Sequence, residues 1–396
     1  SNREKLHDFL KEVPVRENEW DRRHVPYEIA NAEHLAMTES AGMINLSHFA
    51  IIDVEGPDAE CMLEYLSLAK VGGNTPEGRI IYTNFLDGKG GVHADLTISR
   101  LGTDRYRVIT GGADGNRDWV TLRNYRDDNG LKAVIDIRTH DIATLGLWGP
   151  EAKNALGHFV DPNKISIENF PFATAKYLTL NLSGGKTIDV WAARISYVGE
   201  SGWEIYLNNN SEEGLALFDS LLEVGVVPVG IETYANSRRM EKSFRLQGAD
   251  LESEYNACES AIERRIVKEA DFHGKAAHLA HREEEPCAIL CTMTLDSLNV
   301  SGKLRYPVGI SPIIDPDTGE VPVDTKGRRS YSTSMSYCPS IKKHVVMGYL
   351  PKNIAVVGKS LSLEYFNENG DGVYPMTVDI VGKGSIFDPE NKRVRS

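Results

Sequence analysis

The stretch RIIYTNFLDGKGGVHADLTISRL, residues 79–101, is the part of the sequence that most directly predicts a fold. Apolar and polar residues alternate on both sides of the glycine-rich segment 87–91, a pattern typical of two antiparallel strands joined by a turn. A short Gly-Thr-Asp turn and the strand-like run 106–110 follow. The sequence therefore predicts a three-stranded meander.

A second hairpin is predicted further along the chain. Residues 186–197 read as a strand, Gly199 and Gly202 allow a tight turn, and residues 203–207 return from it. Between and after the hairpins, residues 119–125, 213–224 and 232–244 have helical spacing.

The region before the first hairpin reads as a strand at 42–54 followed by a helix from residue 57, and 135–148 reads as a strand pair. This alternation predicts an α+β fold rather than a doubly wound sheet. After residue 284, short strands separated by Gly, Pro and Asp clusters predict an all-β barrel or sandwich. We therefore expect a catalytic region at 1–283 and a C-terminal β-barrel at 284–396.

Composition narrows the class of function. With 396 residues and a formal net charge of −13, the chain lacks the basic surplus that binds nucleic acid or anionic lipid, so a small-molecule partner is expected. No apolar run is long enough for a membrane span and no signal peptide is apparent, which predicts a cytoplasmic protein. The five scattered cysteines predict no disulfide framework and no metal site. Motifs for nicotinamide, ATP and zinc chemistry are missing from the sequence.

The first hairpin offers candidates for catalysis. Tyr82 and Asp95 lie at comparable distances from the turn, so both can present side chains to one pocket. Asp95 stands among apolar residues, where a carboxylate is costly without a partner or a task. His93 precedes it by two residues and would share its strand face. The alternative for Asp95 is a turn cap or a pair with Arg100.

The second hairpin offers candidates for binding. Its tight turn leaves Tyr197 and Glu204 facing inward, with Trp203 beside them. A buried glutamate can accept two parallel hydrogen bonds from a planar donor edge such as that of a pterin or guanine. The alternative is an ion pair with Arg194 or Arg238. Arg239 can bind a carboxylate, although a helix with two adjacent arginines is often only a salt-bridged surface helix.

Several segments together resemble the glycine-cleavage T-protein family, and more closely the folate-binding portion of dimethylglycine and sarcosine dehydrogenases. They stand in the family's order: VEGPDAE (54–60), YTNFL (82–86), GGVHADLTISRL (90–101), LWGPEA (147–152), ISYVGESGWEIY (195–206) and NSRRMEK (236–242). The tail resembles the family's C-terminal barrel through YSTS (331–334) and VMGYLP (346–351).

The resemblance implies a three-lobed ring whose central channel holds tetrahydrofolate. By position, Asp95 matches the catalytic aspartate beside folate N5, and Tyr82 the tyrosine facing it. Tyr197 and Glu204 match the pair that holds the pterin, and Arg239 matches a helix arginine lining the site. A functional link to folate-recycling enzymes is also implied.

The chain departs from the family on the donor side. It has NACESAI (256–262) where the family usually has TPLEAGL, and His93 stands where many members have another residue type. It also lacks a Rossmann glycine motif for FAD. The resulting hypothesis is a tetrahydrofolate-dependent demethylase, similar to stand-alone relatives, that moves a methyl group from a small methylated donor to N5. The alternatives are an aminomethyltransferase forming 5,10-methylenetetrahydrofolate and a non-catalytic folate-binding protein.

Overall fold

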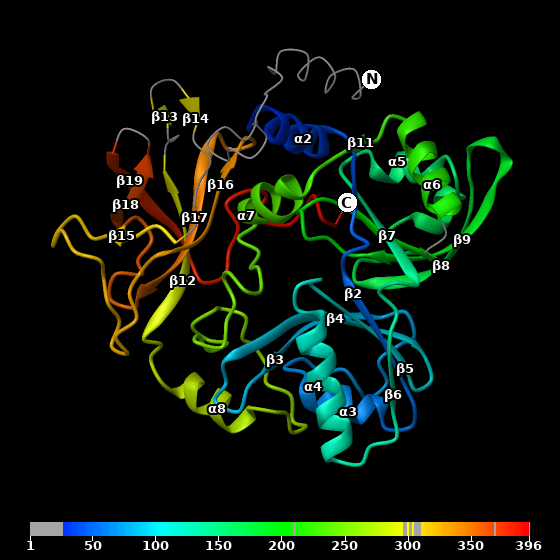
Figure 1. The fold of residues 1–396 in the computed structure, drawn as a ribbon, viewed down its shortest axis with the longest axis horizontal. Coiled ribbons are helices and arrows are strands. Elements are labelled where there is room, and N and C mark those ends of the chain that lie inside the picture. The colour runs from blue at the N-terminus through cyan, green and yellow to red at the C-terminus, as the bar shows by residue number, and fades with distance from the viewer. Residues whose placement is uncertain are drawn as a thin grey trace.

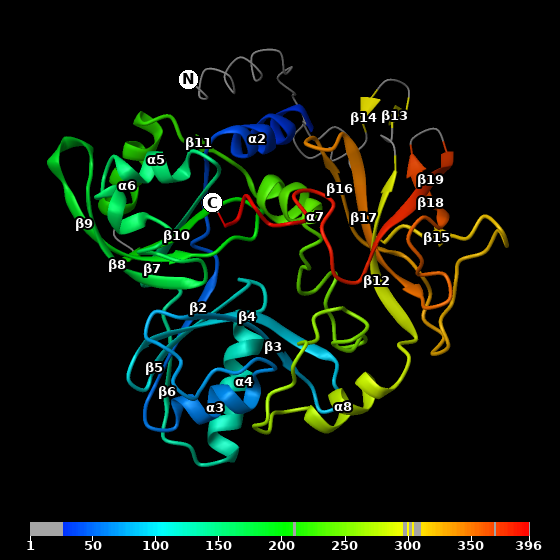
Figure 2. The ribbon, with the colours of Figure 1, turned by 180° about the vertical axis from the view of Figure 1, so that it is seen from behind.

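The computed structural model describes most of the chain. Its described residues are 27–208, 211–295, 299–300, 303–304, 310–367 and 370–395. They form three lobes around a common centre, each built on one large sheet (Figures 1 and 2). In this part of the chain, every helix is too short or too polar to cross a membrane.

The first lobe is a five-stranded sheet with strand order β3-β4-β5-β2-β6. Its strands are β2 (Ala50–Glu55), β3 (Ile80–Leu86), β4 (Val92–Gly102), β5 (Arg105–Thr110) and β6 (Val134–Ile137), and its helices are α3 (Ala59–Leu66) and α4 (Gly115–Asp128). The predicted meander is therefore present as β3, β4 and β5. Ala94, Leu96 and Ile98 of β4 pack with the core residues of α3 and α4, so the alternate residues Asp95 and Thr97 lie on the other face.

The second lobe is a six-stranded sheet of order β11-β1-β7-β10-β9-β8. Its strands are β1 (Gly42–Asn45), β7 (Ile142–Trp148), β8 (Thr174–Asn181), β9 (Thr187–Arg194), β10 (Gly202–Asn208) and β11 (Val227–Pro228). Its helical elements are α5 (Ala152–Gly157), η2 (Pro162–Ile165), η3 (Ser183–Gly185) and α6 (Ser211–Glu223). One face of this sheet packs into the largest apolar core of the protein, together with residues of α5 and α6.

Two strand predictions need correction. Residues 42–54 are not one strand but two, β1 and β2, which belong to different sheets. The strands predicted within 135–148 exist as β6 and β7, but they do not pair: β6 pairs with β2, and β7 with β1 and β10. Both errors arise because the chain crosses between lobes at these points, and local periodicity carries no information about which sheet a strand joins.

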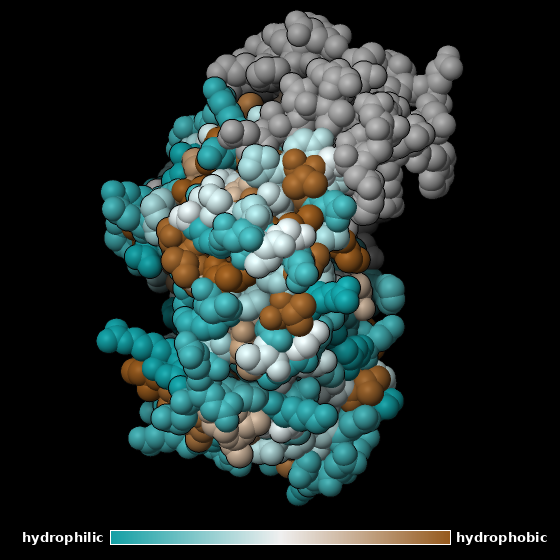
Figure 3. All heavy atoms as spheres, turned by 90° about the vertical axis from the view of Figure 1, so that its left-hand side faces the viewer, coloured by the Kyte–Doolittle hydropathy of each residue, from teal (hydrophilic) through white to brown (hydrophobic). Residues whose placement is uncertain are grey.

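The third lobe is a six-stranded antiparallel sheet of order β15-β18-β19-β12-β17-β16. Its strands are β12 (Ala288–Leu295), β15 (Ile313–Ile314), β16 (Ser332–Cys338), β17 (Lys343–Pro351), β18 (Ser360–Asn367) and β19 (Gly370–Val381), and a separate two-stranded piece contains β13 (Asn299–Val300) and β14 (Lys303–Leu304). The predicted all-β character is confirmed, but the sheet is a half-barrel rather than a full barrel. A bridge between Pro312 and Tyr331 links its two edges. On this side of the molecule, apolar residues form small separate groups among hydrophilic ones (Figure 3).

The lobes meet around a central helical segment. Helix α2 (Tyr27–Glu39), the π-helical turn η4 (Thr233–Arg238) and the short α7 (Arg239–Glu241) lie between the second and third lobes, and α8 (Lys275–Glu283) lies beside the first (Figures 1 and 2). Met240 of α7 packs against residues of β12 and β17. Single-turn π-helical segments are frequent at functional sites, which directs attention to this centre.

Candidate active site

The strand register of the first hairpin decides what surrounds Asp95. Asn84, not Tyr82, stands directly opposite Asp95, and the Asn84 Nδ2 donates to Asp95 Oδ1 over 2.8 Å. Tyr82 lies two residues along the same strand face, and as a hydrogen-bonding neighbour it lowers the pKa of the Asp95 carboxyl. Strand alternation places Asn84 on the same face as Tyr82, so Asn84 could have been predicted as a site residue from the sequence.

Asp95 has no ion-pair partner within the described ranges. Burial raises the pKa of the Asp95 carboxyl to about 6, while hydrogen bonds from Tyr82 and Asn84 and the charge of Arg245 oppose this rise. Arg245 itself donates to the main-chain oxygens of Ser243 and Gly382. The carboxyl can therefore exchange a proton near neutral pH, as a general base requires. We call Tyr82, Asn84, Asp95 and Arg245 the Asp95 group.

The second carboxylate of the site, Glu204, lies on β10 between β7 and β9. It is 5% exposed, and the hydroxyl of Tyr206, two residues along the strand, donates to its Oε2. Burial raises the pKa of the Glu204 carboxyl to about 7 despite this hydrogen bond. Neither predicted ion-pair alternative occurs, because Arg194 bonds to Phe170 O and Ser201 Oγ and Arg238 pairs with Glu200 and Glu241.

Aromatic side chains surround Glu204 and connect it to Asp95. Tyr234 of η4 is an electrostatic neighbour of both Glu204 and Tyr197, and its ring centroid lies 5.4 Å from that of Tyr197. Tyr197 in turn is an electrostatic neighbour of Asp95, so the two predicted hairpins approach the same centre. The Tyr197 hydroxyl donates to Arg245 O over 2.7 Å. We call Glu204, Tyr197, Tyr206 and Tyr234 the Glu204 group.

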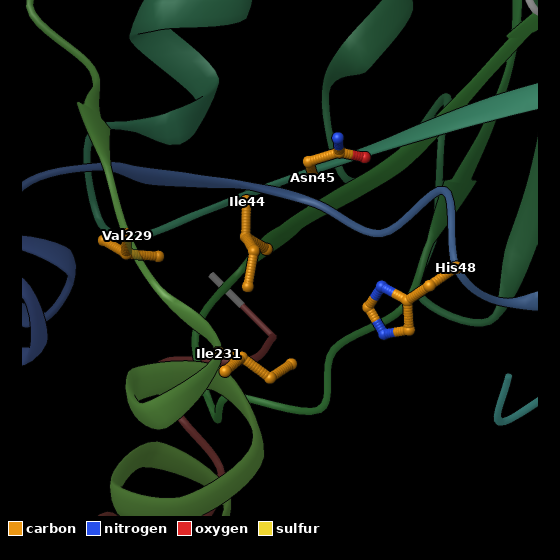
Figure 4. Close-up of a pocket in the computed structure, with 5 residues that line it drawn as sticks. All are labelled: Ile44, Asn45, His48, Val229 and Ile231. Atoms are coloured by element: carbon orange, nitrogen blue, oxygen red, sulfur yellow. The ribbon is translucent and has the colours of Figure 1, made fainter. Parts of the chain in front are cut away.

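A pocket opens on the same face of the second sheet as Glu204. It has a volume of about 410 Å³ and is lined by Ile44, Asn45, His48, Val229 and Ile231. Ile44, Ile231 and the His48 ring turn toward a shared space (Figure 4). Ile44, Gly146 and Glu204 stand in register across β1, β7 and β10, and the indole of Trp148 covers Gly146 between the other two.

Three predicted site residues lie elsewhere or are already engaged. Trp203 points from the opposite face of β10 into the apolar core, where it is fully buried beside Phe170. His93 contacts Thr121 of α4 at 3.1 Å and makes no hydrogen bond with Asp95 among the described residues. Arg239 lies near Tyr197, but its guanidinium is bound to Asp250, Ser334 and the main-chain oxygens of residues 235 and 244.

Other site residues gave different sequence signals. Tyr206 follows Glu204 by two positions, so strand alternation predicts its place. Tyr234 and Arg245 come from the central segment, and no local pattern indicates that they approach the hairpins. Among the residues that the structure describes, no cluster of three or more His, Cys, Asp or Glu side chains is arranged to hold a metal ion.

Comparison with known proteins places the chain in a family. The family model of the GCVT N-terminal domain matches residues 10–270. Aminomethyltransferase from Symbiobacterium thermophilum is 28% identical over 347 residues, covering 86% of this chain and 86% of the relative. Mitochondrial dimethylglycine dehydrogenase from Mus musculus is 28% identical over 376 residues, covering 90% of this chain but only 38% of the relative.

The fold is also found among solved structures. The glycine cleavage system aminomethyltransferase T from Bartonella henselae superimposes with a TM-score of 0.71 and 23% identity, covering 89% of this chain and 88% of that one. The mixed α+β fold is thus shared with that protein, and the resemblance drawn from the sequence is confirmed. The chain belongs to the glycine-cleavage T-protein family, whose members are tetrahydrofolate-dependent one-carbon transferases.

Proposed function

We propose that this chain moves a methyl group from a small methylated donor to N5 of tetrahydrofolate. The observation that carries the proposal is the pair of carboxylates with raised pKa, Asp95 and Glu204. Within the described residues neither forms an ion pair, and each is an electrostatic neighbour of a tyrosine of the pair Tyr197 and Tyr234. Unpaired buried carboxylates are costly, and they are concentrated at sites of binding and catalysis.

The Glu204 group fits the pterin ring. A carboxylate offers about four acceptor positions, and Tyr206 is the sole hydrogen-bond donor to Glu204 within the described ranges. The remaining acceptor positions suit the parallel N–H donors of a pterin edge. The rings of Tyr197 and Tyr234 supply aromatic surface beside this carboxylate, on which a flat heterocycle can pack.

The Asp95 group fits the reacting centre. Tetrahydrofolate, when bound, supplies N5 as the nucleophile that accepts the methyl carbon. Asp95 stabilises the positive charge that develops there and accepts the proton that N5 releases, a task suited to a carboxyl with a pKa of about 6. Tyr82 and Asn84 hold the carboxylate in place. The bond from the methyl carbon to the donor heteroatom breaks, and its electron pair stays on the heteroatom.

The test measures the product directly. Purified protein is incubated with tetrahydrofolate and a panel of ¹³C-methyl-labelled amines, sulfonium compounds, methoxy-aromatics and halomethanes, and folate products are identified by NMR. We expect 5-methyltetrahydrofolate from at least one donor. General base catalysis typically contributes about 10²–10⁴-fold, so Asp95→Asn should lose about that much activity while still binding tetrahydrofolate. Unchanged turnover would remove Asp95 from the chemistry.

The second candidate is aminomethyl transfer to give 5,10-methylenetetrahydrofolate. The aminomethyltransferases among the relatives favour it, since they match the chain over most of both lengths. The same NMR readout separates the two once an aminomethyl donor, labelled with ¹³C at its methylene carbon, joins the panel, because a methyl carbon cannot become a methylene bridge without an oxidant. Labelled methylene-folate from that donor, with no methyl-folate from the methyl donors, would favour this candidate. A chain that binds tetrahydrofolate yet yields neither product from carrier-bound or free donors would be a folate-binding protein without transferase activity.

A further inference from the structure

A cation at the edge of the Asp95 group has no role in the proposal above. The Arg264 guanidinium lies over the Tyr82 ring, 5.9 Å from its centroid, and one of its Nη2 hydrogens is donated to Tyr82 O. Tyr82 in turn makes a hydrogen bond with Asp95. A single tyrosine side chain thus spans the distance from the reacting carboxylate to Arg264.

Arg264 is partly buried and, like Arg245, is not paired with an acidic residue of the described chain. Arg238, Arg239 and Arg328 each form an ion pair with a carboxylate. Within the described ranges, Arg264 has none, and partial burial lowers its pKa. Its Nε and Nη1 groups make no hydrogen bond there. These unused donors are not buried, so they are available to an anion that a ligand supplies.

The loop that carries Arg264 is fastened on both sides. The Arg282 Nη1 donates to Arg264 O over 2.8 Å, and the Lys383 Nζ lies 2.9 Å from Glu263 Oε1. The same segment is joined to the first hairpin through Val92 N, which donates to Tyr255 O. The position of the guanidinium beside Tyr82 is therefore set before a ligand arrives, which lowers the entropy cost of binding.

The two ends of the site differ in the charge of the residue that lies there, which is Glu204 at one end and Arg264 at the other. Glu204 marks one end, the tyrosines Tyr234 and Tyr197 lead to Asp95, and Arg264 lies beyond Tyr82. If the pterin edge binds Glu204, an anion bound at Arg264 lies on the far side of the reacting carboxylate. One guanidinium balances one negative charge, and the nearby Asp95 disfavours a dianion such as phosphate. The planar fork of the guanidinium matches a carboxylate.

We propose that Arg264 binds the carboxylate of the methyl donor, so that the donor is a small methylated acid such as an N-methyl amino acid, a sulfonium carboxylate or a methoxybenzoate. This inference rests on the proposed methyl transfer. It locates donor recognition in the segment just after residues 256–262, where the sequence departs from its family.

The test compares matched pairs of probes on the protein saturated with tetrahydrofolate. Calorimetry measures the affinity of N,N-dimethylglycine against N,N-dimethylethylamine, 3-(dimethylsulfonio)propionate against trimethylsulfonium, and 4-methoxybenzoate against anisole. We expect at least one acid to bind tenfold or more tightly than its partner, and Arg264→Gln to abolish the difference. Arg265→Gln is the matched control, because Arg265 is exposed and next in sequence. It should keep the preference.

Three outcomes would overturn the inference. The first is that no acid binds better than its partner in the wild type. The second is that the preference for the acid survives in Arg264→Gln. The third is that Arg264→Gln weakens binding of tetrahydrofolate but not of tetrahydropteroate, which lacks the glutamate. That result would mean that the Arg264 guanidinium binds the glutamate tail of the folate. Failure of the wild type to bind tetrahydrofolate at all would instead contradict the proposed function.

Discussion

The buried Glu204 and the partly buried Asp95 differ from the buried carboxylates Asp250, Glu241 and Glu259 by what faces them. Asp250, Glu241 and Glu259 each bind an arginine, so their charge is compensated within the protein. Asp95 and Glu204 receive hydrogen bonds from neutral side chains, and burial keeps their pKa values near 6 and 7. Both can therefore change protonation state in the range where an enzyme works.

Removing the amide opposite Asp95 tests its part in setting that pKa. The hydrogen bond from Asn84 favours the ionised carboxylate, so Asn84→Ala should raise the pKa of Asp95 above about 6. If Asp95 is the base, activity rises with pH through its pKa, and this rise should move to higher pH in the variant. The pH profile of kcat/KM checks this. Thr97→Val alters the same face without touching Asp95 and should leave the profile in place.

Glu204 predicts a conflict between stability and binding. Its ordinary pKa of 4.5 becomes about 7 in the folded protein, so between these values the unfolded chain releases a proton that the folded chain retains. The free energy of unfolding therefore falls as pH rises through this window. Glutamine does not titrate, so the free energy of unfolding of Glu204→Gln should not fall in this window. The variant should be more stable than the wild type by about 1–3 kcal/mol at pH 8, but not at pH 4.5.

Thermal unfolding at several pH values measures the stability difference between Glu204→Gln and the wild type. The same variant should bind tetrahydrofolate more weakly, because an amide cannot accept two parallel donors. A stability difference that is constant with pH would mean that Glu204 is not buried as a titrating group. Unaltered folate affinity would refute its role in holding the pterin.

At the scale of the elements, neighbouring residues of strand β10 have different roles, because one faces the site and the next faces the apolar core. Glu204 and Tyr206 share one face of β10, and Trp203 and Ile205 share the other, which packs into the apolar core. As a binding candidate, Trp203 stands next to Glu204 in the sequence, but the period-two alternation of a strand puts its side chain on the opposite face. Its indole interacts with the Arg194 guanidinium, 5.3 Å from the ring, inside the protein.

Replacing Trp203 should therefore affect stability rather than folate binding. Trp203→Ala should lower the free energy of unfolding by about 3–5 kcal/mol, as other large-to-small changes in cores do. Trp203→Phe should cost less and leave the dissociation constant for tetrahydrofolate unchanged. Urea unfolding and fluorescence titration measure the two effects. A Trp203→Phe variant with normal stability and weakened folate binding would return Trp203 to the site.

The sequence predicted the elements whose neighbours are local and missed those whose neighbours are distant. Tyr82 and Asp95 could be placed on one face because a short turn joins their strands. Whether β1 and β2 were one strand could not be read, because each pairs with segments far along the chain. Tyr234 and Arg245 reach the site only through the packing of the central segment between lobes, and no pattern within a few residues encodes that.

At the scale of the whole molecule, Arg239 connects the central segment to a neighbouring lobe. From α7 it binds Asp250 at 2.5 Å and Ser334 of β16 at 2.7 Å, so it fastens the central segment to the third lobe. Arg239→Met would leave Asp250 buried without its cation, which typically costs about 3–5 kcal/mol. Urea unfolding should show this loss. Adding Asp250→Asn should recover part of the lost stability. An Arg239→Met variant as stable as the wild type would contradict this role of Arg239.

The interleaving of the first two lobes has a consequence for how the chain reaches its native state. Met43 of β1 pairs with Leu147 and Pro228, while β2, which begins at Ala50, belongs to the first lobe. During synthesis β1 must therefore wait, unpaired, while the whole first lobe emerges. Closing such long loops is slow because the entropy is lost before the contacts form. We therefore expect the six-stranded sheet to be completed after the first lobe, whose five strands all lie within residues 50–137, has been synthesised.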